Sequence, residues 1–449
     1  MNEALRAAMA QCDPDVELQP SDPRWVDFAS LRGDTHKRLL EKLQSSRAAN
    51  KFAHIAYLGH RGCGKSTELN TLVRDAKARG FLPLKATVTD AFDENEFSFG
   101  DVLRLIAELL DKEFGDRLPA ATIKLVEDWF KEVTHVDATE IERTWKLGAD
   151  AELGVAPTIE AEINVGVGKG KVSSPLGKIL GVLGLLRKST DTRREEIREN
   201  VERHPKALLD QINFLLDDAQ KLVKDVYPGG LVFVLDNVDR YTPEMIDAAF
   251  IKMASLFRSL NAHLIFTVHI SHLYNPSGEV ISDRYDWVTL PMIPVQLRET
   301  HQPNKPVVAR VIEAINKRVP LTLFAQEDLP AQAVQWSGGC PRDLFKLLQL
   351  ALELSEADNK ISASSLQQAA DEQLAQIAAR RLSRAQFDTL VQVHQTGDIE
   401  PSQETREMLY RRDILEYNGQ GWYDAHPLLI RQRRFQEAVA RADASKTQK

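Results

Sequence analysis

The 449-residue sequence is poor in cysteine and has no long apolar run. Its three cysteines, Cys12, Cys63 and Cys340, lie far apart and lack the close spacing of a metal-binding motif. Such sparse use of cysteine favours a reducing compartment over the disulfide-linked class of secreted protein. No stretch reaches the roughly 18 apolar residues that a membrane-spanning helix requires. The N-terminal residues lack the apolar core of a signal peptide. We therefore expect a soluble, cytoplasmic protein.

An excess of positive charge is also missing. The sequence has 57 lysines and arginines against 65 aspartates and glutamates, for a formal net charge of −8. That balance disfavours a dedicated nucleic-acid-binding protein, although it permits a local basic face. With 43% hydrophobic residues the chain can bury a large core, and its length predicts about two to four domains.

What the sequence does contain is a phosphate-binding motif. Residues 55–58 form a short apolar run typical of a buried strand, and residues 59–66 match G-x-x-x-x-G-K-[ST]. A helix is expected at residues 68–78. Glycines in such a loop let successive backbone N–H groups point at phosphate oxygens, beside the positive end of the helix dipole. The order of strand, loop and helix favours a nucleotide site over a chance glycine-rich turn.

We predict that the whole loop binds a nucleotide. Lys65 is expected to reach the β- and γ-phosphates, and the Ser66 hydroxyl is expected to bind Mg²⁺. Cys63 in this loop, with Cys340 in a second glycine-containing stretch, suggests redox control; the simpler explanation is that cysteine is small. The predicted nucleotide-binding residues are Gly59, His60, Arg61, Gly62, Cys63, Gly64, Lys65, Ser66 and Thr67.

A second apolar run, residues 231–236, ends in a carboxylate. Continuous apolar character is typical of a strand buried on both faces of a parallel sheet, and such sheets bind ligands at the carboxyl ends of their strands. Asp236 is therefore predicted to hold Mg²⁺ directly or through water. Many P-loop ATPases place a glutamate next, to activate water, but Asn237 stands here. We expect either that Asp239 is the catalytic base or that hydrolysis is slow.

Two arginines are candidates for catalytic contact with the γ-phosphate. Arg284 precedes a strand expected at residues 287–290 and suits an arginine finger that acts on a neighbouring subunit's nucleotide. A surface ion pair with Asp283 is the alternative. Arg342 lies in the first turn of a helix expected at residues 341–354, a rigid place from which to reach a phosphate. A simple helix-surface arginine is the alternative there.

Hydrophobic periodicity and capping signals predict the other elements. Residues 176–186 are apolar and glycine-dotted, and favour a buried or oligomer-facing helix over an interfacial membrane helix. The rest are a helix at 35–46 capped by Asp34, strands at 83–89 and 263–268, helices at 97–114, 120–133 and 205–226, a hairpin within 151–167, and helices at 307–318 and 328–336.

The segments GHRGCGKST, LVFVLDNVDR and HLIFTV are followed by Arg284 and by SGGCPRDL as a sensor-like element. In this order they resemble the AAA+ and STAND ATPases, particularly the origin-recognition-like branch, over about residues 25–355. The resemblance implies an α/β fold: a P-loop NTPase parallel sheet with a helical lid and a C-terminal winged-helix domain. We divide the chain into an N-terminal linker and helix (1–50), a P-loop domain (51–300, with an insertion at about 115–205), a lid (301–375), and a winged helix with a tail (376–449).

The C-terminal part follows the same resemblance. Helices are expected at residues 384–394 and 405–412, followed by a hairpin at 414–423 whose turn contains Asn418 and Gly419, a strong hairpin signal. Arginines in this part favour DNA binding. Acidic residues are nearly as frequent, so protein docking or autoinhibition is supported at least as well as DNA binding.

The resemblance implies an ATPase that uses ATP and Mg²⁺ as a molecular switch. Its output would be nucleotide-controlled homo-oligomerisation or signalling to a separate effector protein, in bacterial antiphage defence or stress signalling. The alternative is a DNA-binding ATPase of the initiator or loader type. A small-molecule kinase is a third class, for which the sequence supplies no acceptor-site motif.

Overall fold

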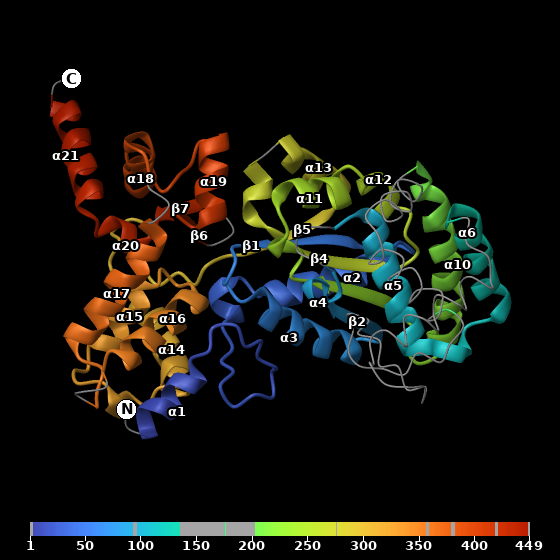
Figure 1. Cartoon of the computed structure of the whole chain (residues 1–449), viewed down its shortest axis with the longest axis horizontal. Coiled ribbons are helices and arrows are strands. Elements are labelled where there is room, and N and C mark those ends of the chain that lie inside the picture. The colour runs from blue at the N-terminus through green and yellow to red at the C-terminus, as the bar shows by residue number, and fades with distance from the viewer. Residues whose placement is uncertain are drawn as a thin grey trace, which may run out of the picture.

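The computed structural model describes residues 3–92, 97–134, 176, 203–274, 276–355, 359–378, 382–417 and 421–447. These residues form a parallel-sheet domain, a helical lid and a C-terminal domain, with the lid and the C-terminal domain on the same side of the sheet domain (Figure 1). The hairpin expected within 151–167, all but the first residue of the apolar segment 176–186, and the expected turn at Asn418 and Gly419 lie outside the described residues.

A five-stranded parallel sheet forms the base of the predicted nucleotide site. The strand order is β2-β3-β4-β1-β5 and every neighbouring pair is parallel. With a phosphate-binding loop after β1, which lies between β4 and β5, this is the topology of a P-loop NTPase, and the predicted fold class is confirmed. The strands are β1 (His54–Gly59), β2 (Phe81–Thr87), β3 (Gly230–Asp236), β4 (His263–His269) and β5 (Asp286–Leu290).

Helices cover both faces of this sheet. Alternate side chains of β1 enter different cores: Ala56 and Leu58 pack into one, and Ile55 and Tyr57 pack into the other. Burial on both faces explains why the strands read as continuous apolar runs. One face carries α2 (Thr35–Ala48) and α3 (Lys65–Ala78). The other carries α5 (Phe99–Phe114), α6 (Ala120–Thr134), α10 (Pro205–Val223), α11 (Pro243–Ile246), α12 (Ala254–Phe257) and α13 (Pro276–Arg284).

Two expected details of this domain are wrong. The strand expected at residues 83–89 ends at Thr87, and the chain turns into the short helix α4 (Val88–Ala91). The Tyr241 hydroxyl bonds to backbone carbonyls of this turn and satisfies them outside the sheet. Asp34 precedes α2 but has a left-handed backbone and does not cap the helix; its carboxylate pairs with Lys37 at 3.0 Å instead.

The lid consists of helices that follow β5. They are α14 (Lys305–Asn316), α15 (Leu329–Trp336), α16 (Pro341–Glu353) and α17 (Ala363–Ala378). The N-terminal helix α1 (Glu3–Gln11) packs on the lid, beside α14 and α16 (Figure 1), and contributes Leu5 and Ala8 to the lid's core. The segment between α1 and α2 therefore crosses from the lid to the sheet domain.

The C-terminal domain has the predicted order of two helices and a hairpin. The hairpin strands β6 and β7 are antiparallel, and a core that contains Leu390, Met408 and Phe435 joins them to the helices. The winged-helix assignment stays a prediction. The expected tail is helical as far as Thr447. The elements are α18 (Arg384–Thr396), α19 (Gln403–Arg411), β6 (Ile414–Tyr417), β7 (Trp422–Ala425), α20 (Pro427–Ile430) and α21 (Arg433–Thr447).

A membrane-crossing helix, judged by length and apolar character, is not found in the described part of the chain.

The junction between the sheet domain and the lid gives a test of the fold. Gly339 has φ +75°, and a Cβ there would lie 1.9 Å from the carbonyl oxygen of Ile293. Gly33 has φ +74° and nothing within 4 Å of the same position. Both alanine variants should incur the left-handed backbone cost of about 1–2 kcal/mol. Only Gly339→Ala also forces two backbone segments apart, so its thermal unfolding midpoint should fall much further. Equal decreases by circular dichroism would contradict this packing.

Candidate nucleotide-binding site

The predicted phosphate loop connects β1 to α3 with two left-handed glycines. Gly62 and Gly64 have φ values of 80° and 101°, which glycine adopts without steric cost. The loop also packs closely on the lid, because a Cβ on Gly62 would lie 2.7 Å from the Cβ of Arg342. Helix α3 begins at Lys65, so the N-terminus of this helix faces the loop as the motif predicts.

Lys65 lies folded into the loop. Its side chain is only 5% exposed, and Nζ donates to the carbonyls of Gly59 (3.0 Å) and His60 (2.8 Å). Nζ also pairs with Oδ2 of Asp239 at 3.0 Å. Burial is the largest single influence and works against the ammonium, but the Asp239 carboxylate, with Cys63 and Asp236, raises the pKa of Lys65 in spite of it. The same pair lowers the pKa of Asp239 in spite of burial. Both groups are therefore charged at neutral pH.

Asp236 ends β3 and is 1% exposed. Its Oδ1 accepts the Asn237 N–H at 2.8 Å, and its Oδ2 pairs with Lys85 Nζ at 3.0 Å. The carboxylate is close enough to Lys65 to help raise the pKa of that lysine. Lys65 and Asp236 thus meet at the same edge of the sheet, as the two motifs predict.

Asn237, which stands where a glutamate was expected, has a left-handed backbone. Its φ is 61°, a conformation that asparagine tolerates better than other residues with a Cβ. The next residue, Val238, donates its N–H to Thr267 Oγ1 at 3.0 Å, so Thr267 supports this turn. His269 contacts Ser271 at 2.9 Å, and burial holds its pKa well below the usual value.

A cavity of about 160 Å³ opens beside the phosphate loop. Four parts of the chain surround it: the loop with the start of α3, the N-terminal segment, the lid, and the turn after β3 with Asn237, Asp239 and Arg240. Its lining includes Gly64, Lys65, Ser66 and Thr67 from the first part, Trp25, Val26, Phe28 and Arg32 from the second, and Arg318, Arg342 and Phe345 from the third. Cationic and apolar side chains share the cavity, as a nucleotide with a phosphate chain and a flat base requires. Acidic side chains line it as well: Asp13, Asp15, Glu17, Glu68 and Asp239.

Arg32 is a candidate functional residue that the sequence did not reveal. It ends a short 3-10 helix, Ala29–Arg32, is buried, and donates from a guanidinium nitrogen to the carbonyl of Cys63 at 2.6 Å. The guanidinium also lies beside Gly64. No motif spacing marks this residue. Lys85 was also missed, but a signal existed, since it is a lone charge within a strand of otherwise apolar residues.

The two arginines proposed for catalysis lie in different places. Arg342 lines the cavity, donates its N–H to the carbonyl of Gly62 at 3.3 Å, and pairs with Asp15 at 3.0 Å. Arg284 is the last residue of α13; it is exposed and is not among the described residues that line the cavity. Action of Arg284 on a neighbouring subunit stays a prediction.

The two cysteines near the loop are buried. Burial raises the pKa of Cys63, and it raises that of Cys340 to about 12. A thiol with so high a pKa is almost entirely protonated at neutral pH and reacts slowly with oxidants. These pKa values favour small size, rather than redox control, as the reason for cysteine at both positions.

The C-terminal domain reaches the phosphate loop from the other side. The Glu416 N–H of β6 donates to His60 Nε2 at 2.9 Å, and Arg412 donates to the Arg61 carbonyl at 3.1 Å. Arg61 in turn donates to the Tyr410 hydroxyl at 2.8 Å. Burial, together with nearby Arg412 and Lys65, lowers the pKa of His60 to about 3. His60 is therefore neutral and accepts the bond from Glu416.

The fold is similar to those of solved archaeal proteins at low identity. A Walker-type ATPase of Pyrococcus abyssi is 12% identical, with a TM-score of 0.43, over 93% of this chain and 98% of that chain. The Orc1 protein of Aeropyrum pernix, solved in complex with DNA, is 13% identical, with a TM-score of 0.39, over 96% of each chain. Cdc6p of Pyrobaculum aerophilum is 10% identical, with a TM-score of 0.36, over 96% of this chain and 98% of that chain. No protein-family model matches the sequence, and no curated protein matches it.

The position of Arg32 predicts a role in nucleotide affinity. Arg32→Ala removes a charge-assisted bond to the loop and a positive charge beside Gly64. Since a charge-assisted hydrogen bond from the guanidinium to a phosphate oxygen would contribute about 1.5–3 kcal/mol, its loss should weaken ATP binding at least about 10-fold. Arg38→Ala, an exposed arginine of neighbouring α2, is the matched control and should bind ATP like wild type. Fluorescent-nucleotide titration measures both affinities. Unchanged affinity in Arg32→Ala would show that this residue has no part in the site.

Proposed function

We propose that the chain is an ATP-binding molecular switch of the STAND or AAA+ type that hydrolyses ATP slowly. One observation carries the proposal. The phosphate loop lines a cavity through Gly64, Lys65 and Ser66, and it is bonded to the C-terminal domain through His60 and Arg61. A nucleotide in the cavity and the docked C-terminal domain therefore share one short loop.

ATP would be held by groups already facing the cavity. Lys65 would exchange the Asp239 carboxylate for phosphate oxygens, because both are anions within reach of the same ammonium. Loop N–H groups and Arg32 would add positive potential. Val26 and Phe28 offer the apolar surface that a base needs.

The residues that fit a Mg²⁺ ion are Asp236 and Ser66. A carboxylate and a hydroxyl are hard oxygen ligands of the kind that Mg²⁺ prefers. Lys85 already places a cation against the Asp236 carboxylate at 3.0 Å, so this position accommodates positive charge. A bound Mg²⁺ would neutralise phosphate charge, and Lys85 would have to yield or share the carboxylate.

Asp239 is the proposed base. It becomes available to orient or deprotonate a water molecule only after Lys65 has turned to the phosphates. Asn237 supplies no carboxylate, and its left-handed backbone disfavours a glutamate there. The missing carboxylate and the left-handed backbone both agree with slow hydrolysis of ATP, which a molecular switch requires. Arg342, which joins the lid to the loop, would sense the γ-phosphate.

The output is proposed to be release of the C-terminal domain, followed by homo-oligomerisation or binding to a separate effector protein. Antiphage defence is the proposed setting, and it rests only on the motif resemblance.

A DNA-bound initiator or loader ATPase is the alternative. Against it, Arg412 is bonded to the loop and to Asp343, Arg411 pairs with Asp413, and Arg433 pairs with Glu437.

Two substitutions separate binding from hydrolysis. Lys65→Ala should lose ATP binding and turnover, because the phosphates lose their main cation. Asp236→Asn should keep part of its ATP affinity but lose Mg²⁺-dependent hydrolysis, because an amide is a poor ligand for Mg²⁺. Equilibrium binding and phosphate release measure the two effects, with circular dichroism as the check of folding. Full activity in both variants would place the chemistry elsewhere.

The switch itself is tested by hydrogen exchange. With Mg²⁺ and a slowly hydrolysed ATP analogue, amide exchange in β6, including that of Glu416, should accelerate as the domain leaves His60. The Lys65→Ala variant should show no such change. Arg412→Gln should accelerate exchange without nucleotide. Amides of β1, buried in the sheet, are the internal control. Identical exchange with and without nucleotide in the wild type would refute the switch while leaving ATP binding intact.

A further inference from the structure

We propose that His301, His394 and Asp424 form a binding site for a divalent transition-metal ion, with Zn²⁺ as the best-fitting ion. The site lies between the segment that enters the lid and the C-terminal domain. Its three residues are not among the described residues that line the nucleotide cavity, and its test does not depend on the proposed nucleotide switch.

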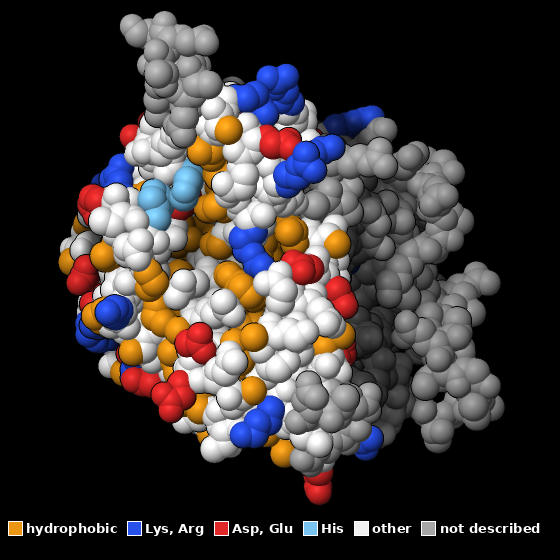
Figure 2. Space-filling view, turned by 90° about the vertical axis from the view of Figure 1, so that its left-hand side faces the viewer, with side chains coloured by type: hydrophobic (Ala, Val, Ile, Leu, Met, Phe, Trp, Pro, Cys, Tyr) orange, Lys and Arg blue, Asp and Glu red, His pale blue; other side chains and the backbone are white. Residues whose placement is uncertain are grey.

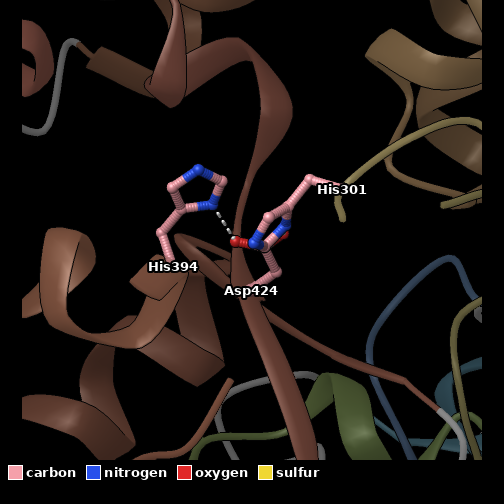
Figure 3. Close-up of side chains that lie close together, drawn as sticks. All are labelled: His301, His394 and Asp424. Carbon is pink, nitrogen blue, oxygen red and sulfur yellow. Dashed lines mark hydrogen bonds and ion pairs between the residues drawn. The ribbon is translucent and has the colours of Figure 1, made fainter. Parts of the chain in front are cut away.

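Three elements that are distant in sequence bring these side chains together. His301 lies in the loop before α14, His394 in the last turn of α18, and Asp424 in β7. Figure 3 shows both imidazoles directed at the carboxylate. The Nδ1 atoms of His301 and His394 lie 3.1 Å and 2.7 Å from different oxygens of Asp424. One ligand atom from each residue lies within 4.8 Å of the others.

Two imidazoles and a carboxylate are a donor set of zinc sites that keep an open position for water. With metal–ligand distances of about 2.0–2.2 Å, the ligand atoms of a tetrahedral site lie roughly 3.4 Å apart. The observed separations need only small side-chain rotations to reach that value. The nitrogens that would bind the ion are the two Nδ1 atoms, which already face Asp424. Each can act as a ligand once it carries no proton.

The surroundings hold the anionic ligand in place and leave access for an ion. Asp424 has a side chain that is 0% exposed; it accepts the Ala425 N–H at 2.7 Å and a bond from the Gln296 amide. Such supporting bonds orient metal-ligating carboxylates. His301 and His394 are 31% and 24% exposed, and Figure 2 shows neighbouring histidine side chains on this face of the molecule. Solvent can therefore supply both the ion and a fourth ligand.

The backbone of His301 adds an independent observation. Its φ is 52°, a left-handed conformation that costs free energy for a residue with a Cβ. The loop turns back on itself there, with the His301 N–H bonded to the Leu297 carbonyl at 2.9 Å. This turn brings the imidazole to within 4.2 Å, centroid to centroid, of the ring of His394. An ion between the rings would fix the lid entrance to the C-terminal domain.

The experiment uses the full chain freed of metal by a chelator. Zn²⁺ affinity is measured by competition with a chromophoric chelator, and Co²⁺ is added as a spectroscopic probe. Wild type should bind one equivalent of Zn²⁺ and show visible Co²⁺ absorption of a four- or five-coordinate site. His301→Ala and His394→Ala should each weaken binding at least about 10-fold, the range over which changes around metal sites act. His204→Ala, an exposed histidine of the sheet domain, should match wild type.

Thermal unfolding supplies a second readout. Zn²⁺ should raise the unfolding midpoint of wild type and of His204→Ala, and leave those of His301→Ala and His394→Ala unchanged. Should one ligand variant fail to fold, the other still tests the site, because the two histidines come from different elements. The proposal is overturned if wild type binds no stoichiometric Zn²⁺, or if the ligand variants bind it like the control. None of these readouts involves ATP.

Discussion

The buried ion pair between Lys65 and Asp239 is the interaction on which the nucleotide site depends. Both side chains are almost inaccessible to water, so each charge requires the other. The pair joins the loop after β1 to the turn after β3, although β4 lies between these strands. Removing either charge would leave the other buried and unpaired, which is strongly destabilising. An anionic phosphate can replace the carboxylate as the partner of Lys65, but it leaves Asp239 without that cation. The unliganded pair therefore defines the charge that the site should accept, and Asp239 then needs a new partner, such as a water molecule.

The same loop explains how events in the cavity could reach the rest of the molecule. Gly64, Lys65 and Ser66 of the loop line the cavity. On the other side, the Arg412 guanidinium donates to the Arg61 carbonyl, and the Arg342 backbone N–H donates to the Gly62 carbonyl. A change of loop conformation cannot serve one set of partners without disturbing the other. Coupling of this kind needs no long pathway through the protein. It needs a single element with two arrangements, and the loop is the element that both domains contact.

The sequence predicted the parts of this site that are local. The phosphate loop and the strand ending at Asp236 follow from motif spacing and hydrophobic period, whereas the helices and hairpin of the C-terminal domain were expected from the family resemblance. Arg32 and the cluster of His301, His394 and Asp424 could not be found that way, because their contacts join residues far apart in the sequence. Lys85 left a signal as the one charged residue of its strand, but its pairing with Asp236 is equally long-range. Asn237 is different again. From the sequence it is only a departure from the glutamate that many P-loop ATPases have at this position. The structure explains why asparagine suits the position, because the backbone there is left-handed.

Arg412 shows why counting basic residues says little about a partner. In the sequence it belongs to a cluster of arginines that suits DNA. In the structure it has a left-handed backbone, pairs with the buried carboxylate of Asp343 at 3.2 Å and donates to the Arg61 carbonyl. Burial alone would raise the pKa of Asp343, but Arg412 and His426 outweigh burial and lower this pKa. The carboxylate is therefore charged and requires a cation. Arg412 therefore ties the lid and the loop to the C-terminal domain. The guanidinium of Arg412, which could attract the phosphate backbone of DNA, instead holds the lid, the phosphate loop and the C-terminal domain together. It becomes available to a partner only once these three parts separate.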